Sequence, residues 1–361
     1  MNPATDRLRI PSSPGPVIGS LCTGAAGLDL ATLAVLGGRL TWCADNDPHM
    51  SALLEIRAPG VPNLGDLRTV NWATVAPVDL ITAGFPCQDV SSAGFRAGIE
   101  KGHRSGIWRD IVHAVRVLRP RLLFVENVAA LRWRHGGLHR VLADLATAGY
   151  DTCWRSIRAA DIGAPHRRER LFLLAWDRQA PSHTTGSRRL VQRDQRRQSA
   201  GWTVPSRCST STTNAKSVRR CQKSPRPARL QTRPHAPIRC HRRHPQPARR
   251  SCSGSPKAAD HNATAAHWGD YAPAIRYWEE TTGRSTPQPT QPGRNSHPVL
   301  SAAFVEHLMG LPPGWVTSLP LPRTAMLRAL GNSVVPPQAA HALRLLLLDH
   351  AADFIERDTR S

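Results

Sequence analysis

The sequence predicts an α/β fold in which a central sheet carries helices on both faces. Short apolar runs typical of buried strands occupy residues 17–22, 78–83 and 122–125. Between them, residues 28–36 form an apolar helix-like run, and the apolar residues of 107–118 recur at helical spacing. Strands that alternate with helices are typical of sheets with a parallel core, because each helix carries the chain back across the sheet.

Basic residues are concentrated in one part of the chain. The 361 residues have a formal net charge of +22, and residues 181–258 hold 19 Lys and Arg against one acid, Asp194. This segment also lacks hydrophobic periodicity and is dominated by Arg, Pro, Ser and Thr, a composition that cannot supply a packed core. A basic excess of this size predicts a polyanionic partner such as nucleic acid.

Several protein classes are excluded by composition. The eight cysteines include no C-x-x-C pair, so neither a disulfide scaffold nor a metal site is predicted, and Cys240, His241 and His244 are the nearest approach to a metal cluster. Residues 1–16 are rich in Pro and Ser, so we expect a disordered terminus rather than a secretory signal. No run of about 18 apolar residues predicts a membrane span. We therefore expect a cytoplasmic protein with free thiols.

A glycine-containing turn follows the first predicted strand. Thr23, Gly24 and Gly27 lie between residues 17–22 and the helix-like run 28–36. Strand, glycine turn and helix begin a nucleotide-binding βαβ unit, because small residues allow the backbone to approach the ligand at the helix N-terminus. A purely structural turn explains the same pattern equally well.

Acidic residues follow the next two segments. Asp45 ends the predicted strand 40–44, about 20 residues beyond the glycine turn, where a carboxylate can accept from ribose hydroxyls. Asp47 precedes Pro48 and is assigned instead as a helix N-cap. Asp66 follows Gly65 and is either an acceptor for an adenine amino group or a plain turn residue.

The predicted strand 78–83 ends just before a cysteine. Gly84 and Pro86 precede Cys87, so the strand delivers a thiol to a loop, which is a common way to place a nucleophile. The alternative is that Cys87 is a small buried apolar residue. From Cys87 to Gly106 the chain is rich in Gly and Ser, which predicts a mobile segment able to close over substrate.

Charged side chains follow the later strands. Glu126 ends the apolar strand 122–125 and is expected at the same sheet edge as Cys87, although a capping or surface role is the alternative. Arg168 and Arg170 alternate into the strand beginning at residue 171, so they share a face. Two guanidiniums there can hold a base carbonyl, a carboxylate or a phosphate, or form a solvated basic edge.

Taken in order, these motifs resemble those of the DNA cytosine-5 methyltransferases, the S-adenosylmethionine-dependent enzymes of bacterial modification systems. The blocks that carry the resemblance are Thr23-Gly24-Ala25-Ala26-Gly27, Pro86-Cys87-Gln88 with Ser91, Glu126-Asn127-Val128, Arg168-Glu169-Arg170 and Gly331-Asn332-Ser333-Val334-Val335. The resemblance implies a Rossmann-like mixed sheet of seven strands and a small target-recognition region inserted before the final motifs. Two departures are Ala26, where glycine is common, and His166, where glutamine is usual.

The resemblance also implies roles for individual residues. S-adenosylmethionine would be surrounded by Thr23, Gly24, Gly27, Asp45, Asp66, Pro86, Asn332 and Ser333, and DNA would be contacted by Gln88 and Ser91. Cys87 would add to carbon 6 of a flipped-out cytosine, with Glu126, Arg168 and Arg170 as the other catalytic residues and Arg168 holding the ring carbonyl. The implied partner is double-stranded DNA, with a cognate restriction endonuclease as a further partner of the modification system. We expect a monomer without a metal.

The expected organisation has a catalytic and cofactor-binding domain at 17–178, a target-recognition region at 179–298, and final motifs at 299–361 that complete the first domain. Within the target-recognition region, residues 180–260 are either a basic DNA-binding arm or the translation of a wrong reading frame of a GC-rich gene. We favour the wrong reading frame because Arg greatly outnumbers Lys in this segment. Two other functions are compatible with the sequence. They are an RNA cytosine-5 methyltransferase and a catalytically silent DNA-binding relative.

Overall fold

The computed structural model describes residues 15–85, 106–133, 136–179 and 268–358. They contain a six-stranded sheet whose strands lie in the order β2-β1-β3-β4-β6-β5. The strands are β1 (Val17–Leu21), β2 (Arg39–Ala44), β3 (Leu80–Ala83), β4 (Leu122–Val128), β5 (Tyr150–Arg158) and β6 (Glu169–Asp177). The first four are parallel, whereas β6 is antiparallel to both β4 and β5. The predicted α/β class with a Rossmann-like sheet is confirmed.

One isolated bridge adjoins the outer edge of β2 in the described part of the chain. Beyond the β2 edge, Cys43 pairs in parallel with Asn63 alone. Pro62 precedes Asn63 and has no N–H to extend the ladder, and Gly65 follows it with a φ of +72°. Among the described residues the sheet therefore ends at β2 and has six strands, where the resemblance implied seven.

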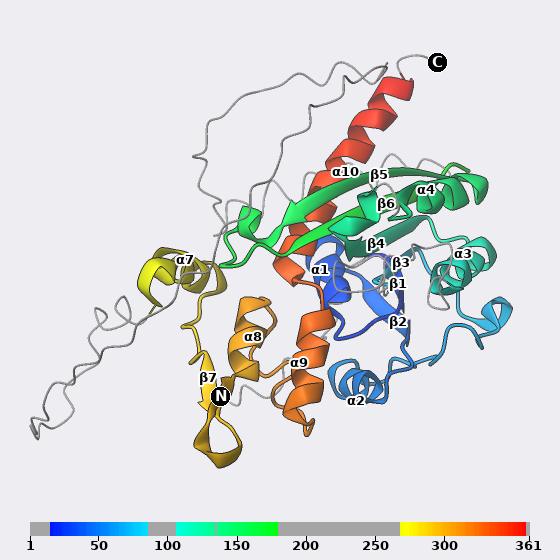
Figure 1. Cartoon of the computed structure of the whole chain (residues 1–361). Coiled ribbons are helices and arrows are strands. Elements are labelled where there is room, and N and C mark those ends of the chain that lie inside the picture. The colour runs from blue at the N-terminus through cyan, green and yellow to red at the C-terminus, as the bar shows by residue number, and fades with distance from the viewer. Residues whose placement is uncertain (1–14, 86–105, 134–135, 180–267, 359–361) are drawn as a thin grey trace, which may run out of the picture. The chain divides into compact units, whose positions relative to one another are not determined.

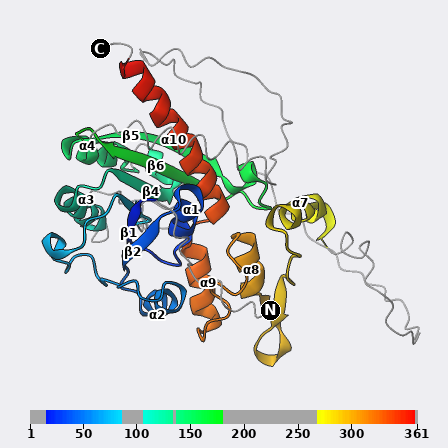
Figure 2. The same cartoon turned by 180° about the vertical axis from the view of Figure 1, so that it is seen from behind.

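Helices cover both faces of the sheet. On one face α1 (Gly27–Leu36) packs beside α10 (Pro336–Asp358), and both contribute to a core with Ile18, Leu80 and Phe124. Figures 1 and 2 show α10 running alongside α1 in both views. On the other face α3 (Gly106–Leu118) and α4 (Leu138–Thr147) pack on Ile81 and Leu123. Alternate residues of β3 and β4 thus enter different cores, as the strand period requires.

The last part of the chain packs against the first. A third core joins α2 (Pro48–Arg57) to α8 (Ala302–Leu308) and α9 (Arg323–Asn332). The same part also holds α7 (Ala272–Thr282) and the hairpin of β7 (Thr290–Pro292) and β8 (Pro298–Leu300). All described residues belong to one compact unit built from both ends of the chain. In the described ranges, no helix has the length and apolar character needed to cross a bilayer.

The register of β3 and β4 places the ends of these strands side by side. Ala83 is paired with Val125, so Gly84, directly after β3, lies beside Glu126, which stays in β4 opposite Phe172 of β6. A Cβ built on Gly84 would lie 3.8 Å from Oε2 of Glu126. In open α/β sheets, ligands bind in the crevice at the carboxyl ends of the parallel strands.

Candidate active site

The glycine turn after β1 is shaped by close backbone contacts. Gly24 has a φ of +55° and donates its N–H to Oδ2 of Asp45 at 2.7 Å. A Cβ built on Gly27 would lie 2.6 Å from the carbonyl oxygen of Val334. The close approach of residues 331–335, called the C-terminal segment below, therefore requires glycine at position 27. Ala26 is also left-handed, with a φ of 58°, which is the conformation that explains why glycine is common at this position.

The two aspartates after β2 have different roles. Asp47 caps α2 by accepting the backbone N–H groups of His49 and Met50, which confirms the predicted cap. Asp45 accepts the N–H of Asp47 at 2.9 Å and that of Gly24 at 2.7 Å. Burial raises the pKa of Asp45, and these two N–H donors oppose the rise. In this structure the Asp45 carboxylate therefore supports the turn.

Asp66 lies near the turn, because its charge, after burial and Asp45, contributes to the raised pKa of Cys22. It forms an ion pair with Arg68 and accepts from the side chain of Asn46 at 3.4 Å. The hydrogen bond from Arg68 is the main reason why the pKa of Asp66 falls to about 2. Its proposed contact with an adenine amino group stays a prediction.

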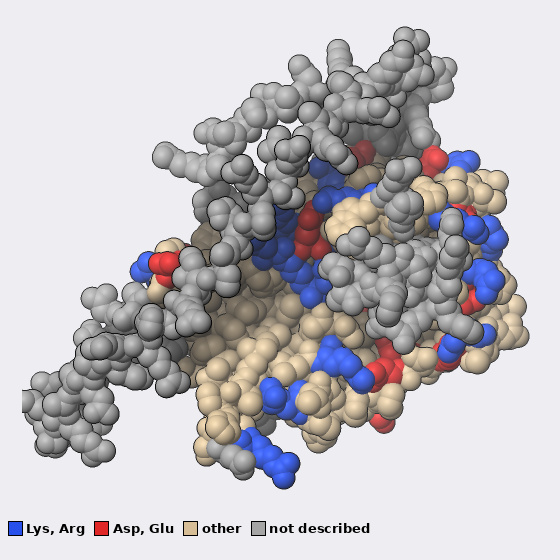
Figure 3. All heavy atoms as spheres, viewed as in Figure 1, with Lys and Arg blue, Asp and Glu red and all other residues tan. Residues whose placement is uncertain are grey.

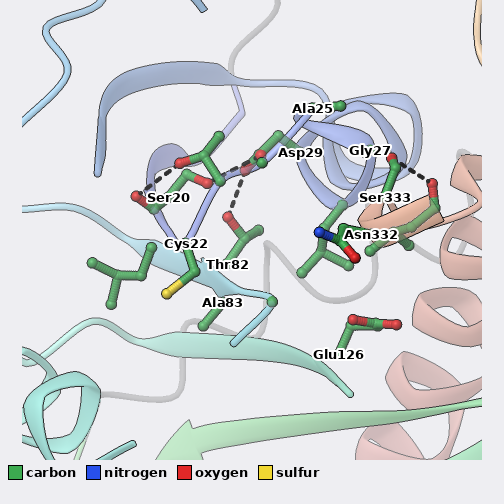
Figure 4. Close-up of a pocket in the computed structure, with 16 residues that line it drawn as sticks. Ser20, Cys22, Ala25, Gly27, Asp29, Thr82, Ala83, Glu126, Asn332 and Ser333 are labelled. Atoms are coloured by element: carbon green, nitrogen blue, oxygen red, sulfur yellow. Dashed lines mark hydrogen bonds between the residues drawn. The ribbon is translucent and has the colours of Figure 1, made fainter. Parts of the chain in front are cut away.

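A cavity joins the glycine turn to Glu126. Its empty space, part of which opens to solvent, is about 350 Å³. It is lined by Ser20, Leu21, Cys22, Thr23, Gly24, Ala25, Gly27, Leu28, Asp29, Thr82, Ala83, Gly84, Glu126, Asn332, Ser333 and Val334. Figure 4 shows these side chains converging from β1, α1, β3, β4 and the segment between α9 and α10. Five predicted cofactor residues therefore line one cavity with Glu126, whereas Asp45 and Asp66 do not line it.

Sequence reasoning missed four polar residues in this wall. Ser20, Asp29 and Thr82 form one hydrogen-bonded group, and Cys22 lies at the end of β1 with a φ of 51°. Burial raises the pKa of the Cys22 thiol to about 12, so this thiol stays protonated. A polar residue within an apolar strand or in the first turn of an apolar helix was the signal that could have identified Ser20, Thr82 and Asp29.

Glu126 is a buried carboxyl group with one ion-pair partner. Its Oε1 lies 2.9 Å from Nε of Arg170, and the residue is 7% exposed. Burial raises the pKa of Glu126, while Arg170 and then Arg168 oppose the rise. A carboxyl group poised in this way can carry or share a proton with a bound base.

Arg168 holds the C-terminal segment rather than facing open space. Its Nη1 donates to the carbonyl of Gly331 at 2.9 Å and its Nη2 to that of Ser333 at 2.6 Å. The buried Nε has no hydrogen-bond partner among the described residues. Burial lowers the pKa of Arg168 to about 10. Gln338 reinforces the link by donating to the Arg168 carbonyl at 2.9 Å.

Asn127 connects β4 to the chain that leads to Cys87. Its Nδ2 donates to the carbonyl of Phe85 at 3.0 Å, and both groups are buried. Phe85 is the last described residue before the gap at 86–105. The predicted site residues Pro86, Cys87, Gln88 and Ser91 lie outside the described residues.

Other contacts connect the last motifs to the site. Nε2 of His166 lies 2.9 Å from the carbonyl of Leu308 at the end of α8, and burial lowers the pKa of this imidazole. Nε1 of Trp315 donates to the carbonyl of Ala25 in the glycine turn at 2.8 Å. Glu306 accepts four hydrogen bonds from the segment that holds Trp315. Both residues belong to the stretch 300–315, which resembles the family block before the last one, but the sequence assigned no role to either of them.

The charged groups around the site are partly paired. Figure 3 shows basic side chains adjoining acidic ones near the middle of the face. Besides the Glu126–Arg170 pair, Arg132 pairs with Glu169 at 2.9 Å. The basic segment 181–258 and the residues Cys240, His241 and His244 lie outside the described residues. Within the ranges that are described, no group of three His, Cys, Asp or Glu could hold a metal ion.

Comparison with known proteins gives a match over nearly the whole chain. The family model for C-5 cytosine-specific DNA methylases matches residues 17–346. The Type II methyltransferase M2.BsuMI of Bacillus subtilis is 34% identical over 162 residues, which cover 43% of this chain and 41% of that protein. The Type II methyltransferase M.HhaI of Haemophilus parahaemolyticus is 30% identical over 158 residues, covering 43% and 47%. The chain thus spans less than half the length of these relatives. The extent of the family match shows that this chain belongs to the C-5 cytosine-specific DNA methylase family.

Proposed function

We propose that this protein transfers a methyl group from S-adenosylmethionine to carbon 5 of a cytosine in double-stranded DNA. One observation carries the proposal: a single cavity extends from the glycine turn to Glu126, which lies in β4 just beyond the last residue paired with β3. A cofactor at the turn would then lie next to a base held by the carboxyl group. Family membership supports the same reaction.

The residues of the turn fit S-adenosylmethionine. A Cβ built on Gly24 would meet nothing within 4 Å, so the turn leaves open space on the cavity side. Ser333 and the N-terminus of α1 supply polar groups to the same wall. The cofactor would supply an electrophilic methyl group, and Thr23, Gly24, Gly27, Asn332 and Ser333 would hold it. Asp45, Asp66 and Pro86 remain proposed contacts to its other parts.

Cys87 would activate the cytosine ring. Its thiolate adds to carbon 6, which breaks the aromatic conjugation and makes carbon 5 nucleophilic. Loss of the carbon 5 proton after methylation then expels the thiolate and restores the ring. Phe85, two residues earlier, is held to β4 by Asn127, which supports placing the thiol near Glu126.

Glu126 and the arginines would stabilise the charge on the ring. A protonated Glu126 can donate to ring nitrogen 3, and burial favours this protonated form. The family resemblance implies that Arg168 holds the ring carbonyl, but both terminal nitrogens of Arg168 donate to backbone carbonyls. We therefore propose that Arg170 and Glu126 together stabilise the charge on the cytosine ring, and that Arg168 positions the C-terminal segment.

The substrate must be presented outside the helical stack. Flipping a cytosine out of duplex DNA costs a few kcal/mol, which contacts in the pocket and to phosphates would offset. Gln88 and Ser91 are proposed DNA contacts. We further propose a cytoplasmic monomer that acts in a modification system with a cognate restriction endonuclease.

The test uses the full-length chain with labelled S-adenosylmethionine. We expect label in duplex DNA and none in transfer RNA. A duplex that contains 5-fluorocytosine should form a denaturation-resistant adduct with the wild-type protein, because fluorine at carbon 5 cannot leave as a proton does. Cys87→Ala should abolish both methyl transfer and the adduct while cofactor binding persists.

Each contrary outcome of this test identifies a different alternative. Label in transfer RNA alone would support an RNA methyltransferase. Binding of DNA and cofactor by the wild-type protein without transfer would support a catalytically silent relative. Retained turnover in Cys87→Ala would remove the covalent mechanism.

A further inference from the structure

Asp29 is a buried carboxyl group in the cavity wall that the proposed chemistry does not use. It lies in the first turn of α1, two residues after Gly27, and is 1% exposed. Figure 4 shows its side chain beside those of Ser20 and Thr82, on the side of the cavity formed by β1 and β3. A fully buried acid without a structural partner of opposite charge requires an explanation.

Two hydroxyl groups hold the Asp29 carboxylate. Oδ2 accepts from Oγ of Ser20 at 3.0 Å, and Oδ1 accepts from Oγ1 of Thr82 at 2.5 Å. These donors fix the carboxyl group between β1, β3 and α1. Among the described residues, no Lys, Arg or His forms an ion pair with Asp29. Its negative charge is therefore stabilised by hydroxyl dipoles and the helix N-terminus, without a neutralising cation.

The other titratable groups near Asp29 do not supply that cation. Cys43 on β2 and Cys22 after β1 are thiols whose pKa values burial raises to about 12, so both are neutral. Asp45 is a further acid, and Glu126 on β4 is already paired with Arg170. Burial raises the pKa of Asp29 to about 6, which leaves it ionised at neutral pH. The inner wall of the cavity is thus negative.

We propose that Asp29 is a specificity-determining residue that makes the cavity prefer a cationic sulfonium ligand over the corresponding neutral thioether. This inference rests on the proposed use of S-adenosylmethionine. That cofactor and its product, S-adenosylhomocysteine, share every other group and differ by one methyl and one positive charge. A fixed carboxylate in the wall acts equally on the charges that the two ligands share, so the sulfonium charge makes the difference: the carboxylate favours the donor and promotes release of the product.

The expected size of the preference follows from Coulomb's law. A charge pair several ångströms apart in a partly buried site gives a difference in affinity of about tenfold or more. Because Ser20 and Thr82 orient the carboxylate in advance, little of this interaction is lost to reorganisation on binding.

The experiment measures dissociation constants of both ligands for the full-length protein by calorimetry. The variants are Asp29→Asn and, as a control, Thr32→Val, which removes another buried hydrogen bond of α1, from Oγ1 to the Leu28 carbonyl. We expect Asp29→Asn to weaken S-adenosylmethionine binding about tenfold while S-adenosylhomocysteine binding changes little. The control should leave the ratio of the two constants unchanged. If Asp29→Asn leaves the ratio of the two dissociation constants unchanged, whether both ligands bind as before or both bind equally more weakly, the inference is overturned.

A measurement on the wild-type protein keeps the inference testable if the variant does not fold. The preference for the sulfonium should be larger at about pH 8 than at about pH 5, because Asp29 is neutral at the lower pH. A ratio that is flat over this range would contradict the inference. Failure of the wild-type protein to bind either ligand would instead overturn the proposed function.

Discussion

Asn127 and Phe85 are joined by a buried hydrogen bond of 3.0 Å from Nδ2 of Asn127 to the Phe85 carbonyl. This bond ties the residue after Glu126 on β4 to the residue at which the chain leaves β3 toward Cys87. The two strands already place their ends together through the pairing of Ala83 with Val125. The side-chain bond extends that alignment beyond the sheet, into the segment that carries the proposed nucleophile.

Removing this bond should impair methyl transfer more than cofactor binding. For Asn127→Ala we expect a loss of about 1–3 kcal/mol in transition-state stabilisation, which is roughly 5-fold to 150-fold in kcat, because the buried Phe85 carbonyl loses its donor. Calorimetry should give an unchanged S-adenosylmethionine affinity. Asn71→Ala is the matched control, since Asn71 caps a short 3-10 helix through an exposed hydrogen bond and does not line the cavity. Wild-type kcat in Asn127→Ala would contradict the role given to this bond.

Arg168 should stabilise the wall of the proposed cofactor site, because it holds the C-terminal segment in place. We expect Arg168→Ala to lower the free energy of unfolding by about 2–3 kcal/mol, because two carbonyls lose a buried charged donor. The affinity for S-adenosylmethionine should fall as well, since Ser333 lines the cavity. Denaturant titration and calorimetry measure the two effects.

A second arginine provides the control for Arg168. Arg155 joins β5 to α10 through an exposed ion pair with Asp349 at 2.7 Å. Arg155→Ala should cost less than about 1 kcal/mol and leave cofactor affinity unchanged, because exposed ion pairs contribute little. Equal effects of the two substitutions would argue against a special role for Arg168.

The buried acid Asp29 should make the protein less stable as the pH rises. Its pKa is about 6 in the folded state against 3.8 normally, so between these values the unfolded chain releases its proton first. The stability contributed by the protonated form is complete below about pH 4 and is lost as the pH rises through about 6. The shift corresponds to at most about 3 kcal/mol.

Asp29→Asn should remove this pH dependence. Thermal unfolding of the wild-type protein and the variant between about pH 4 and pH 8 tests the sign, because the variant cannot ionise at this position. We expect the stability of the variant, relative to that of the wild-type protein, to increase as the pH increases. A stability difference that stays constant across this range would show that folding does not raise the pKa of Asp29.

The basic segment gives a prediction about the gene. If residues 180–260 are translated from a wrong frame, resequencing will show a broken frame, and peptide mass data from the native source will contain no peptides from 188–257. An unbroken frame with such peptides would refute that hypothesis. The segment would then act as a DNA-binding arm, and DNA affinity should fall steeply with salt because many phosphate counterions are released.

Much of the sheet and part of the site could be predicted from local sequence. Apolar runs bounded by glycine and polar residues identified β1, β3 and β4, because buried strands of a parallel core are apolar on both faces. The N-cap role of Asp47 followed from the neighbouring Pro48 in the same way. Glu126 was identified because a single acid follows the apolar run 122–125, although β4 itself continues to Val128.

Contacts between distant parts of the chain could not be predicted in this way. Arg168 was read as a ligand for the ring carbonyl, since its spacing from Arg170 gives the face but not the partner. The structure shows that carbonyls 163 and 165 residues further along the chain accept its hydrogen bonds. Asp29 was overlooked because its hydroxyl partners come from two strands, β1 and β3, that lie outside its own helix.

The sequence by itself determined the order of strands and helices, the family motifs and the identity of the chemical groups, because these depend on neighbouring residues. Only the tertiary structure decided which groups share the cavity and which support it from outside. The physical reason is that burial and hydrogen-bond partners depend on how β1, β3, β4 and the segment before α10 meet in space. The Glu126 carboxylate is thus paired with Arg170, whereas the Asp29 carboxylate is held by two hydroxyl groups.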